Sequence, residues 1–136
     1  MKFKLEIVTP EGLLYTAEVD TVIIPTSQGE IGILAHHMPL VSMISPGEIK
    51  IKKDSEINYM AITGGFVQIT STKVTILADA AERAEEIDME RALRARERAQ
   101  KFLEEKRLNK MSHAETMAAL QRALTRIKVA RRRHSF

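Results

Sequence analysis

The 136-residue sequence has no cysteine and no tryptophan, and only 4% of its residues are aromatic. The lack of cysteine excludes thiol nucleophiles, thiolate metal sites and disulfides, so packing must stabilise the fold, and a reducing compartment such as the cytoplasm is expected. No apolar run approaches the roughly 20 residues that span a bilayer. Glu6 also interrupts the apolar segment that an export signal would need. Membrane association is therefore expected only through a partner.

Common catalytic and metal-binding motifs are also missing. The sequence contains no GxxxxGK[ST] phosphate-binding loop, no GxGxxG, no GxSxG and no HExxH. His36 and His37 are adjacent and so point in different directions, while the other two histidines lie far away in the sequence. We therefore predict no metal site and no active site, and favour a binding or regulatory protein over an enzyme.

Charge is distributed unevenly along the chain. Residues 1–87 carry 7 Lys and Arg against 12 Asp and Glu, whereas residues 88–136 carry 14 against 6. The formal net charge of +3 thus combines an acidic first part with a basic second part. Such an asymmetry predicts different partners for the two parts.

Residues 1 to about 77 show the period-two patterning of half-buried strands. Phe3, Leu5 and Ile7 alternate with polar or smaller residues, and similar alternation recurs at 49–52 and 67–70. The β-branched runs at 22–24 and 74–76 add strand candidates. Turn-forming residues separate these segments at 10–12, 27–29, 45–47, 53–55 and 64–65. Strands and turns without intervening helices predict an antiparallel β-sandwich or a flattened barrel.

From Asp79 onward the composition shifts to helix formers. Asp88 is a candidate N-cap, and an apolar stripe follows it at helical spacing. The stripe comprises Met89, Ala92, Ala95, Ala99, Phe102 and Leu103. Ser112 and Glu115 match the S-x-x-E capping box of a second helix. The stripe of this second helix comprises Met117, Leu120, Leu124 and Ile127.

The link at 108–111 is short, so the two helices are expected to fold back as an antiparallel hairpin. Four alanines would permit their close approach: Ala95, Ala99, Ala119 and Ala123. The predicted fold is therefore α+β, with a β-sandwich body over residues 1–84 and a helical arm over residues 85–136. A permanently packed hairpin and a mobile arm are both compatible with this pattern.

The second helix carries an unbalanced positive charge, because residues 116–136 contain no Asp or Glu. Its basic residues are Arg122, Arg126, Lys128, Arg131, Arg132 and Arg133. Antiparallel pairing about residue 110 would set Arg98 near Arg122, and Arg94 or Ala95 opposite Arg126. Such a cluster suits phosphate or carboxylate oxygens, although a solvated charged face is the alternative. Nucleic acid is the least favoured anion, since aromatic residues are few and the first part is acidic.

Several motifs together carry a family resemblance. They are Gly29-Glu30-Ile31-Gly32-Ile33-Leu34, His37-Met38-Pro39-Leu40-Val41, Ile44-Ser45-Pro46-Gly47-Glu48-Ile49, Gly64-Gly65-Phe66-Val67 and Val74-Thr75-Ile76-Leu77-Ala78. With them the chain resembles, over essentially its whole length, the epsilon subunits of bacterial rotary proton-translocating ATP synthases. The resemblance implies an N-terminal β-sandwich and a C-terminal helical hairpin, and a role in ATP synthesis and hydrogen ion transport.

The resemblance further implies a non-catalytic rotor subunit of the central stalk, peripheral to the cytoplasmic face of the bacterial cell membrane. The body would bind the gamma subunit and the c-ring, with Glu30 and His37 as candidate ring contacts. The arm could extend to the alpha and beta subunits, where its basic helix meets an acidic segment of beta and opposes ATP hydrolysis. Candidates for that contact are Arg122, Arg126, Arg131, Arg132 and Arg133.

A narrower resemblance concerns ATP as a regulatory ligand. Ile87-Asp88-Met89-Glu90-Arg91-Ala92 is similar to the I/L-D-x-x-R-A motif of epsilon subunits that bind ATP on the folded hairpin. By this correspondence, Glu82, Ile87, Asp88, Arg91 and Ala92 would surround the adenosine, and Arg98, Arg122 and Arg126 would approach the phosphates. Asp88 as a plain N-cap is the alternative for this motif. The rival for the whole chain is a free-standing module whose basic hairpin binds an acidic protein or nucleic acid.

Overall fold

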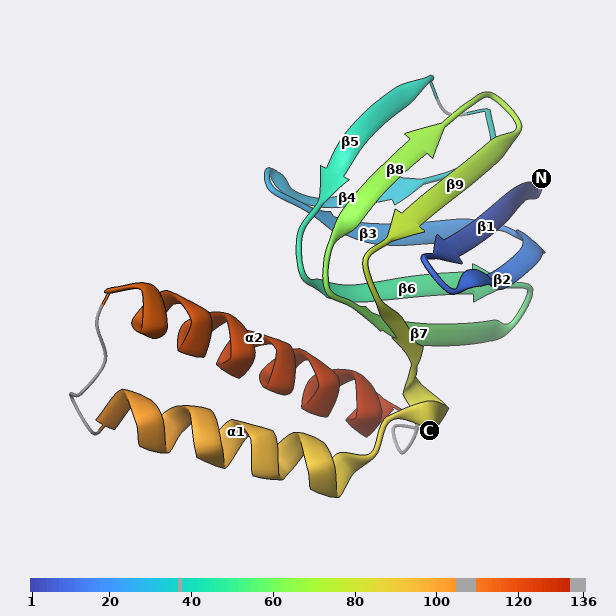
Figure 1. Ribbon diagram of the computed structural model, residues 1–136. Coiled ribbons are helices and arrows are strands. Elements are labelled where there is room, and N and C mark those ends of the chain that lie inside the picture. The colour runs from blue at the N-terminus through green and yellow to red at the C-terminus, as the bar shows by residue number, and fades with distance from the viewer. Residues whose placement is uncertain (37, 105–109, 133–136) are drawn as a thin grey trace. The chain divides into compact units, whose positions relative to one another are not determined.

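The computed structural model describes residues 1–36, 38–104 and 110–132. The chain divides into two compact units, Met1–Arg83 and Ala84–Phe136, and each is described by itself (Figure 1).

The first unit is built from ten strands. They are β1 (Phe3–Thr9), β2 (Gly12–Val19), β3 (Thr21–Thr26), β4 (Gly29–Ile33), β5 (Leu40–Ile44), β6 (Gly47–Lys53), β7 (Glu56–Ile62), β8 (Gly65–Ile69), β9 (Lys73–Ala78) and β10 (Ala81–Arg83). The strand order is β10-β7-β6-β3-β5-β8-β9-β1-β2, and β4 pairs with β3. Among the described strands, β1 and β9 pair in parallel and the other pairs are antiparallel.

The sheet folds over into two layers, β5-β8-β9-β1-β2 and β4-β3-β6-β7-β10 (Figure 1). The layers join where Thr26 of β3 pairs with Ile44 of β5. The predicted alternation is confirmed in β1, where Phe3, Leu5 and Ile7 are buried. The core between the layers consists mainly of aliphatic side chains, each worth about 1.5–3 kcal/mol when fully buried. Its largest fully buried members are Leu5, Ile7, Ile24, Ile33, Ile49, Ile51, Met60, Ile62, Ile69 and Ile76.

The five predicted turns all fall where one strand ends and the next begins, and each includes one residue of a neighbouring strand: Gly12, Gly29, Gly47, Lys53 or Gly65. In the turn between β6 and β7, Asp54 has a φ of 56°, a conformation that a short polar side chain tolerates. Its backbone N–H donates to Asp20 Oδ2 at 2.7 Å, and its Oδ1 lies 2.6 Å from Lys2 Nζ. These contacts tie the turn to residues from two other parts of the same unit.

The second unit contains a short 3₁₀ helix, η1 (Ala84–Glu86), and two α-helices, α1 (Met89–Glu104) and α2 (Lys110–Arg132). The α-helices lie side by side and run antiparallel, and η1 contacts α2 (Figure 1). The predicted β-sandwich followed by a helical hairpin is therefore confirmed. The start of the second helix was predicted wrongly, because α2 already includes Lys110 and Ser112 lies inside it. Of the predicted link, residues 108 and 109 lie outside the described residues.

Fewer residues of the two helices are buried than the predicted apolar stripes contain. Ala92 and Ala99 are buried on α1, and Ala123, Ile127, Val129 and Ala130 are buried on α2. Phe102, Met117 and Leu124, which were expected on the buried stripes, are instead about half exposed. Small side chains such as Ala92, Ala99 and Ala123 allow the helix backbones to approach closely, so the buried face is narrow, and it includes Ile127 and Val129 as its larger members.

Candidate functional site

The outer face of the layer β5-β8-β9-β1-β2 exposes a continuous row of apolar side chains. The register pairs Met43 with Phe66, Phe66 with Leu77, Leu77 with Val8, and Val8 with Leu13. Directly opposed residues of neighbouring strands share a face, so these five residues form what we call the apolar row. Met43, Phe66, Leu77 and Leu13 are 59, 50, 49 and 58% exposed, and Val8 is partly buried. A contiguous exposed apolar surface of this kind marks an interaction site.

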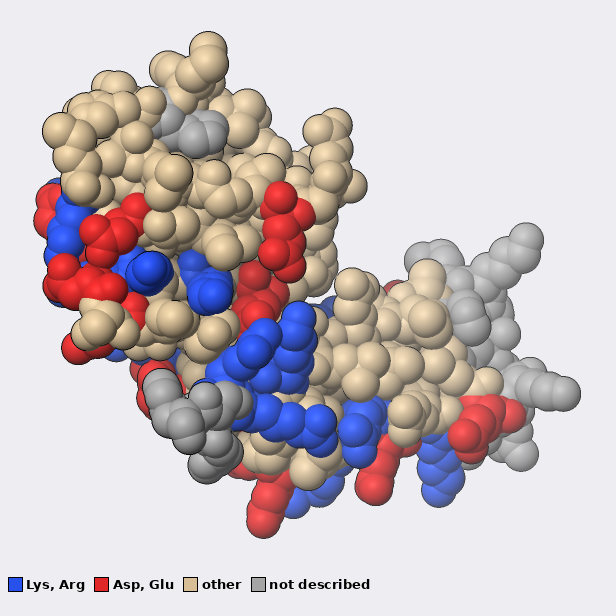
Figure 2. Space-filling view, turned by 180° about the vertical axis from the view of Figure 1, so that it is seen from behind, with Lys and Arg blue, Asp and Glu red and all other residues tan. Residues whose placement is uncertain are grey.

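One segment of the sandwich, residues 31–47, lacks charged side chains, and we call it the uncharged segment. Residues 31–47 contain no Lys, Arg, Asp or Glu, and Leu34 and Met38 in this segment are 61 and 79% exposed. Figure 2 shows that the upper part of the sandwich carries no acidic side chain, lysine or arginine on the visible face. His36, with a φ of 64°, places its Nε2 3.0 Å from Met1 Sδ. The segment therefore presents apolar groups where desolvation costs little.

Of the two candidate ring contacts, only Glu30 belongs to the described residues, and it directly precedes the uncharged segment. Glu30 is exposed in β4, paired with Pro25 close to the turn from β3. His36 follows the opposite end of β4, so the length of that strand separates Glu30 from the segment around it. His37 lies outside the described residues. A ring contact through these two positions stays a prediction.

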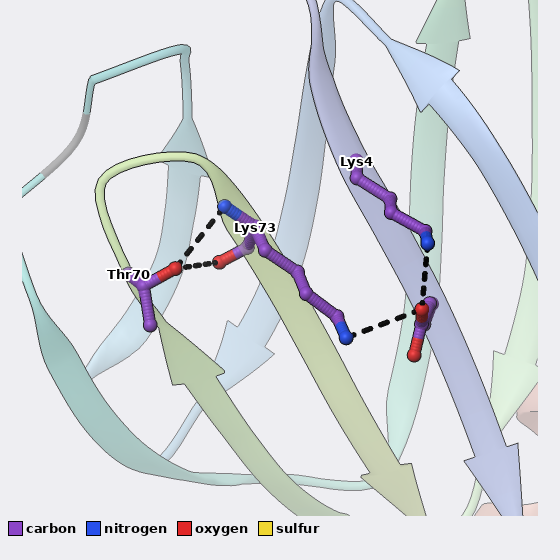
Figure 3. Close-up of polar contacts among 4 residues, drawn as sticks. Lys4, Thr70 and Lys73 are labelled. Carbon is purple, nitrogen blue, oxygen red and sulfur yellow. Dashed lines mark hydrogen bonds and ion pairs between the residues drawn. The ribbon is translucent and has the colours of Figure 1, made fainter.

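A small ion-pair cluster lies on the same face as the apolar row. The carboxylate of Glu6 is 3.3 Å from Lys4 Nζ and 3.2 Å from Lys73 Nζ (Figure 3). Thr70 Oγ1 donates to the carbonyl of Lys73 at 3.1 Å and accepts from the Lys73 N–H at 3.2 Å, which closes the turn between β8 and β9. Hydrogen bonds from Lys73 and then Lys4 lower the pKa of the Glu6 carboxyl.

Replacing Glu6 with glutamine is expected to reduce stability at neutral pH but not in acid. Because the folded pKa of Glu6 lies below its unfolded value, its stabilising contribution is present above the unfolded pKa and is lost as pH falls through the folded pKa. Thermal unfolding of wild type and Glu6→Gln between pH 7 and pH 2 measures this. Glu11→Gln, which alters an exposed carboxylate, is the control. A difference in Tm that is independent of pH would contradict the expectation.

The residues of the ATP-like motif build the start of α1. Asp88 Oδ1 accepts the N–H of Arg91 at 3.1 Å, and its carbonyl accepts the N–H of Ala92 at 3.0 Å, so the predicted N-cap is confirmed. Ile87 and Ala92 are buried, whereas Asp88 and Arg91 are exposed. Glu82 belongs to the other unit, in β10, paired with Ala61 of β7. The motif thus has a structural role, and nucleotide contact stays a prediction.

The predicted arginines differ in exposure. Arg98, Arg122 and Arg131 are exposed, and Arg126 and Arg132 are partly buried. Arg133 lies outside the described residues. Figure 2 shows Lys and Arg side chains gathered along the visible face of the hairpin.

Sequence reasoning missed one residue of α1, Arg96, which is partly buried and whose Nε has no hydrogen-bond partner among the described residues. The spacing Ala92, Arg96, Ala99 could have identified it, since these positions share one helix face.

The described residues offer neither a metal-binding cluster nor a membrane-spanning helix. Within residues 1–36, 38–104 and 110–132, no group of three or more His, Asp or Glu residues could hold a metal ion. No helix in the part of the chain that the structure describes is long and apolar enough to cross a membrane.

A β-sandwich followed by an antiparallel helical hairpin defines the class of fold, and two family models match the two units. Residues 2–84 match the ATP synthase, Delta/Epsilon chain, beta-sandwich domain, and residues 85–131 match the corresponding long alpha-helix domain. The chain therefore belongs to the ATP synthase delta/epsilon chain family.

Curated relatives agree with this assignment. The ATP synthase epsilon chain of Dehalococcoides mccartyi is 45% identical over 132 residues, which is 97% of this chain and 94% of the relative. That of Halalkalibacterium halodurans is 41% identical over 128 residues, 94% of this chain and 96% of the relative. The resemblance to ATP synthase epsilon subunits is thus confirmed. The alternative of a free-standing binding module finds no support in these matches.

Solved structures share the fold. A chain of the mitochondrial ATP synthase of Euglena gracilis, solved with OSCP, F1 and c-ring, aligns with a TM-score of 0.78 at 25% identity, over 88% of this chain and 76% of that chain. A chain of the central stalk and c-ring of the Tetrahymena thermophila mitochondrial ATP synthase aligns with a TM-score of 0.64 at 15% identity, over 96% and 97%. The latter likeness concerns the fold alone.

Proposed function

We propose that this chain is a non-catalytic central-stalk subunit of a proton-translocating ATP synthase, held to the rotor by its sandwich and regulating ATP hydrolysis through its hairpin. The observation that carries the proposal is the apolar row on a sandwich whose family is that of ATP synthase delta and epsilon chains. The curated relatives are named epsilon chains, and the Euglena and Tetrahymena structures include a c-ring.

The gamma subunit is the partner that we assign to the apolar row. A rotor contact must transmit torque, and the row stands on five hydrogen-bonded strands whose other face packs into the core. Burying apolar surface stabilises such a contact by roughly 25 cal/mol per Å². The row also lacks charges that would need partners across the interface. These properties favour a permanent, stiff contact over a transient one.

The c-ring is the partner that we assign to the uncharged segment. The candidate contacts are His37, which belongs to this segment in the sequence, and Glu30, which directly precedes it. The exposed Leu34 and Met38 of this segment would meet the ring without the cost of desolvating charges. In this proposal the subunit sits at the cytoplasmic face of the bacterial cell membrane and reaches the membrane only through the complex.

The hairpin would oppose ATP hydrolysis when its basic helix binds an acidic segment of the beta subunit within the alpha and beta head. Candidates are Arg122, Arg126, Arg131, Arg132 and Arg133, on a segment without compensating acidic residues after Glu115. ATP would act as a regulatory ligand that stabilises the folded hairpin. If the folded and extended forms of the arm are equally populated, ATP shifts them tenfold toward the folded form by binding it about 1.4 kcal/mol more tightly. Release of the arm at low ATP is therefore energetically accessible.

Removing the arm tests this proposal. In ATP synthase reconstituted with residues 1–86, the subunit is expected to assemble with gamma, while ATPase activity at low ATP rises severalfold over that with the full chain. Co-purification with gamma and steady-state ATPase rates measure the two effects separately. Equal ATPase rates with the full chain and with residues 1–86 would contradict the inhibitory role of the arm. Failure of both chains to co-purify with gamma would contradict the rotor role.

A further inference from the structure

Among the described strands, four lie at the edges of the two layers: β2 and β5 in one layer, β4 and β10 in the other (Figure 1). An edge strand exposes unpaired backbone groups, and natural proteins usually protect it with charged side chains, bulges or prolines. Three of the four edges carry charge, namely Glu18 in β2, Glu30 in β4, and Glu82 with Arg83 in β10. Strand β5, with the sequence LVSMI, carries none.

Strand β5 is open along most of one side. It pairs with β8 from Leu40 to Ile44 without a break in register. On its other side, β3 meets it where Thr26 pairs with Ile44. In the part of the chain that the structure describes, no strand pairs with residues 40–43 on that side. Pro39 precedes the strand and lies outside it, so it leaves this edge open.

The hydrogen bonds of β8 determine which residues of β5 direct their backbone groups to the open edge. The N–H of Thr70 donates to the carbonyl of Lys73 at 2.9 Å, and the N–H of Asp79 donates to the carbonyl of Gly64 at 3.0 Å. In a sheet, residues of one strand bond alternately to the neighbour on one side and to the neighbour on the other. The even-numbered residues of β8 therefore bond to β9, and its odd-numbered residues bond to β5.

The odd-numbered residues of β8 pair with the even-numbered residues of β5. Val41 and Met43 therefore direct their N–H and C=O groups away from β8, to the open edge. Ser45, the next residue of this series, fits the same pattern, since its N–H donates to the carbonyl of Pro25 in β3 at 3.0 Å. The side chains of Val41 and Met43 are apolar and 68 and 59% exposed. Both the backbone and the side chains of this edge are thus available to a partner.

We propose that β5 accepts an extended strand of the gamma subunit, which bonds to the backbone of Val41 and Met43 and carries apolar side chains at every second position. The inference rests on the proposed contact between gamma and the apolar row, and adds how gamma is held there. Met43 belongs both to the row and to the open edge, so a strand beside β5 continues the row onto the partner. Strand addition of this kind obtains affinity from main-chain hydrogen bonds and specificity from alternate side chains.

Amide hydrogen exchange, measured by NMR on the full chain alone and bound to purified gamma, tests the inference. In the free chain, the amides of Val41 and Met43 should exchange much faster than that of Ser42, which bonds to β8. In the complex, both should slow by more than about 100-fold, because an added strand accepts their protons. Unchanged exchange in a complex that still forms would overturn the strand addition and leave the rotor contact in place. A gamma subunit that does not bind the chain would overturn both.

Val41→Pro separates the backbone contact from the side-chain contact. Proline removes the N–H of residue 41, and an edge strand tolerates proline where that N–H faces solvent. We expect the affinity for gamma to fall by about tenfold or more, because a carbonyl of the added strand loses its donor. Val41→Thr is the matched control, since it keeps the N–H and the branched shape, and it should change the affinity by less than about fivefold. Equal losses in the two variants would overturn the backbone contact, and the exchange measurement on wild type decides the question if Val41→Pro does not fold.

A second copy of this chain is the competing occupant of the open edge. In that case, the amides of Val41 and Met43 would become protected without gamma as the protein concentration rises, and sedimentation would show dimers. This result would overturn the assignment of the edge to gamma. A chain that stays monomeric, with both amides unprotected until gamma is added, supports the assignment.

Discussion

Replacing Gly65 with alanine is expected to lower the free energy of unfolding by about 3 kcal/mol, a large share of the stability of a domain of this size. Gly65 has a φ of 144°, a conformation that costs other residues about 1–2 kcal/mol. A Cβ there would also overlap the carbonyl oxygen of Leu77 and lie 3.0 Å from Ala78 Cα. Because these are backbone atoms of β9, relief requires a shift of the strand, which costs a further 1–3 kcal/mol or so.

Gly29→Ala is the matched control, since it isolates the conformational cost. Gly29 has a φ of 111°, but nothing lies within 4 Å of a Cβ built there. Its replacement should cost only about 1–2 kcal/mol. Urea unfolding followed by circular dichroism gives both values. If the two variants lost equal stability, the close approach of β9 to Gly65 would have no energetic consequence.

The strands were predictable because period two is a local property of the sequence. Burial of one side of β1, β6 and β8 follows directly from residues such as Leu5, Ile51 and Val67, and the turns carry their own chemical signals. The parallel pairing of β1 with β9 was not predictable, because no local pattern specifies which distant strand becomes a neighbour. The strand order therefore had to come from the structure.

The apolar row of the candidate site was not predictable either, because it too depends on which strands are neighbours. Its members come from five strands, and each alone looks like an ordinary apolar residue. Single exposed apolar side chains need no explanation. Only the register shows that Met43, Phe66 and Leu77 stand next to one another on one face. The charge asymmetry of the sequence indicated two surfaces but did not show that one of them is apolar.

In the hairpin, the sequence predicted the local cap but not which side chains are buried. The cap at Asp88 was predictable because it depends on residues within one turn. The pairing of the helices depends on a link that includes residues outside those described. Arg98, which was expected to approach an anion, is exposed, whereas Arg96 is partly buried. The burial of Ala92 and Ala99 identifies the buried face of α1, which composition alone does not do.

The largest functional effect is expected for Phe66→Asp, near the middle of the apolar row. If the row binds the gamma subunit, this change buries an unpaired carboxylate in the interface and removes an aromatic contact. It should weaken binding by at least about 3 kcal/mol, or more than about 100-fold in Kd. Because Phe66 is 50% exposed in the isolated chain, its circular dichroism spectrum and Tm should change little. Binding to purified gamma, measured by calorimetry, checks the prediction.

Ile57→Asp is the matched control, because Ile57 is also an exposed apolar residue, 38% exposed, but lies in β7 of the other layer. It makes the same change of charge and polarity on a strand that contributes nothing to the row. It should therefore leave the affinity for gamma within about threefold of wild type, as surface changes away from an interface usually do. If both variants bound gamma as wild type does, the apolar row would not be the rotor contact. If both lost binding equally, added negative charge anywhere on the sandwich would explain the loss, through long-range repulsion that 0.5 M salt should suppress.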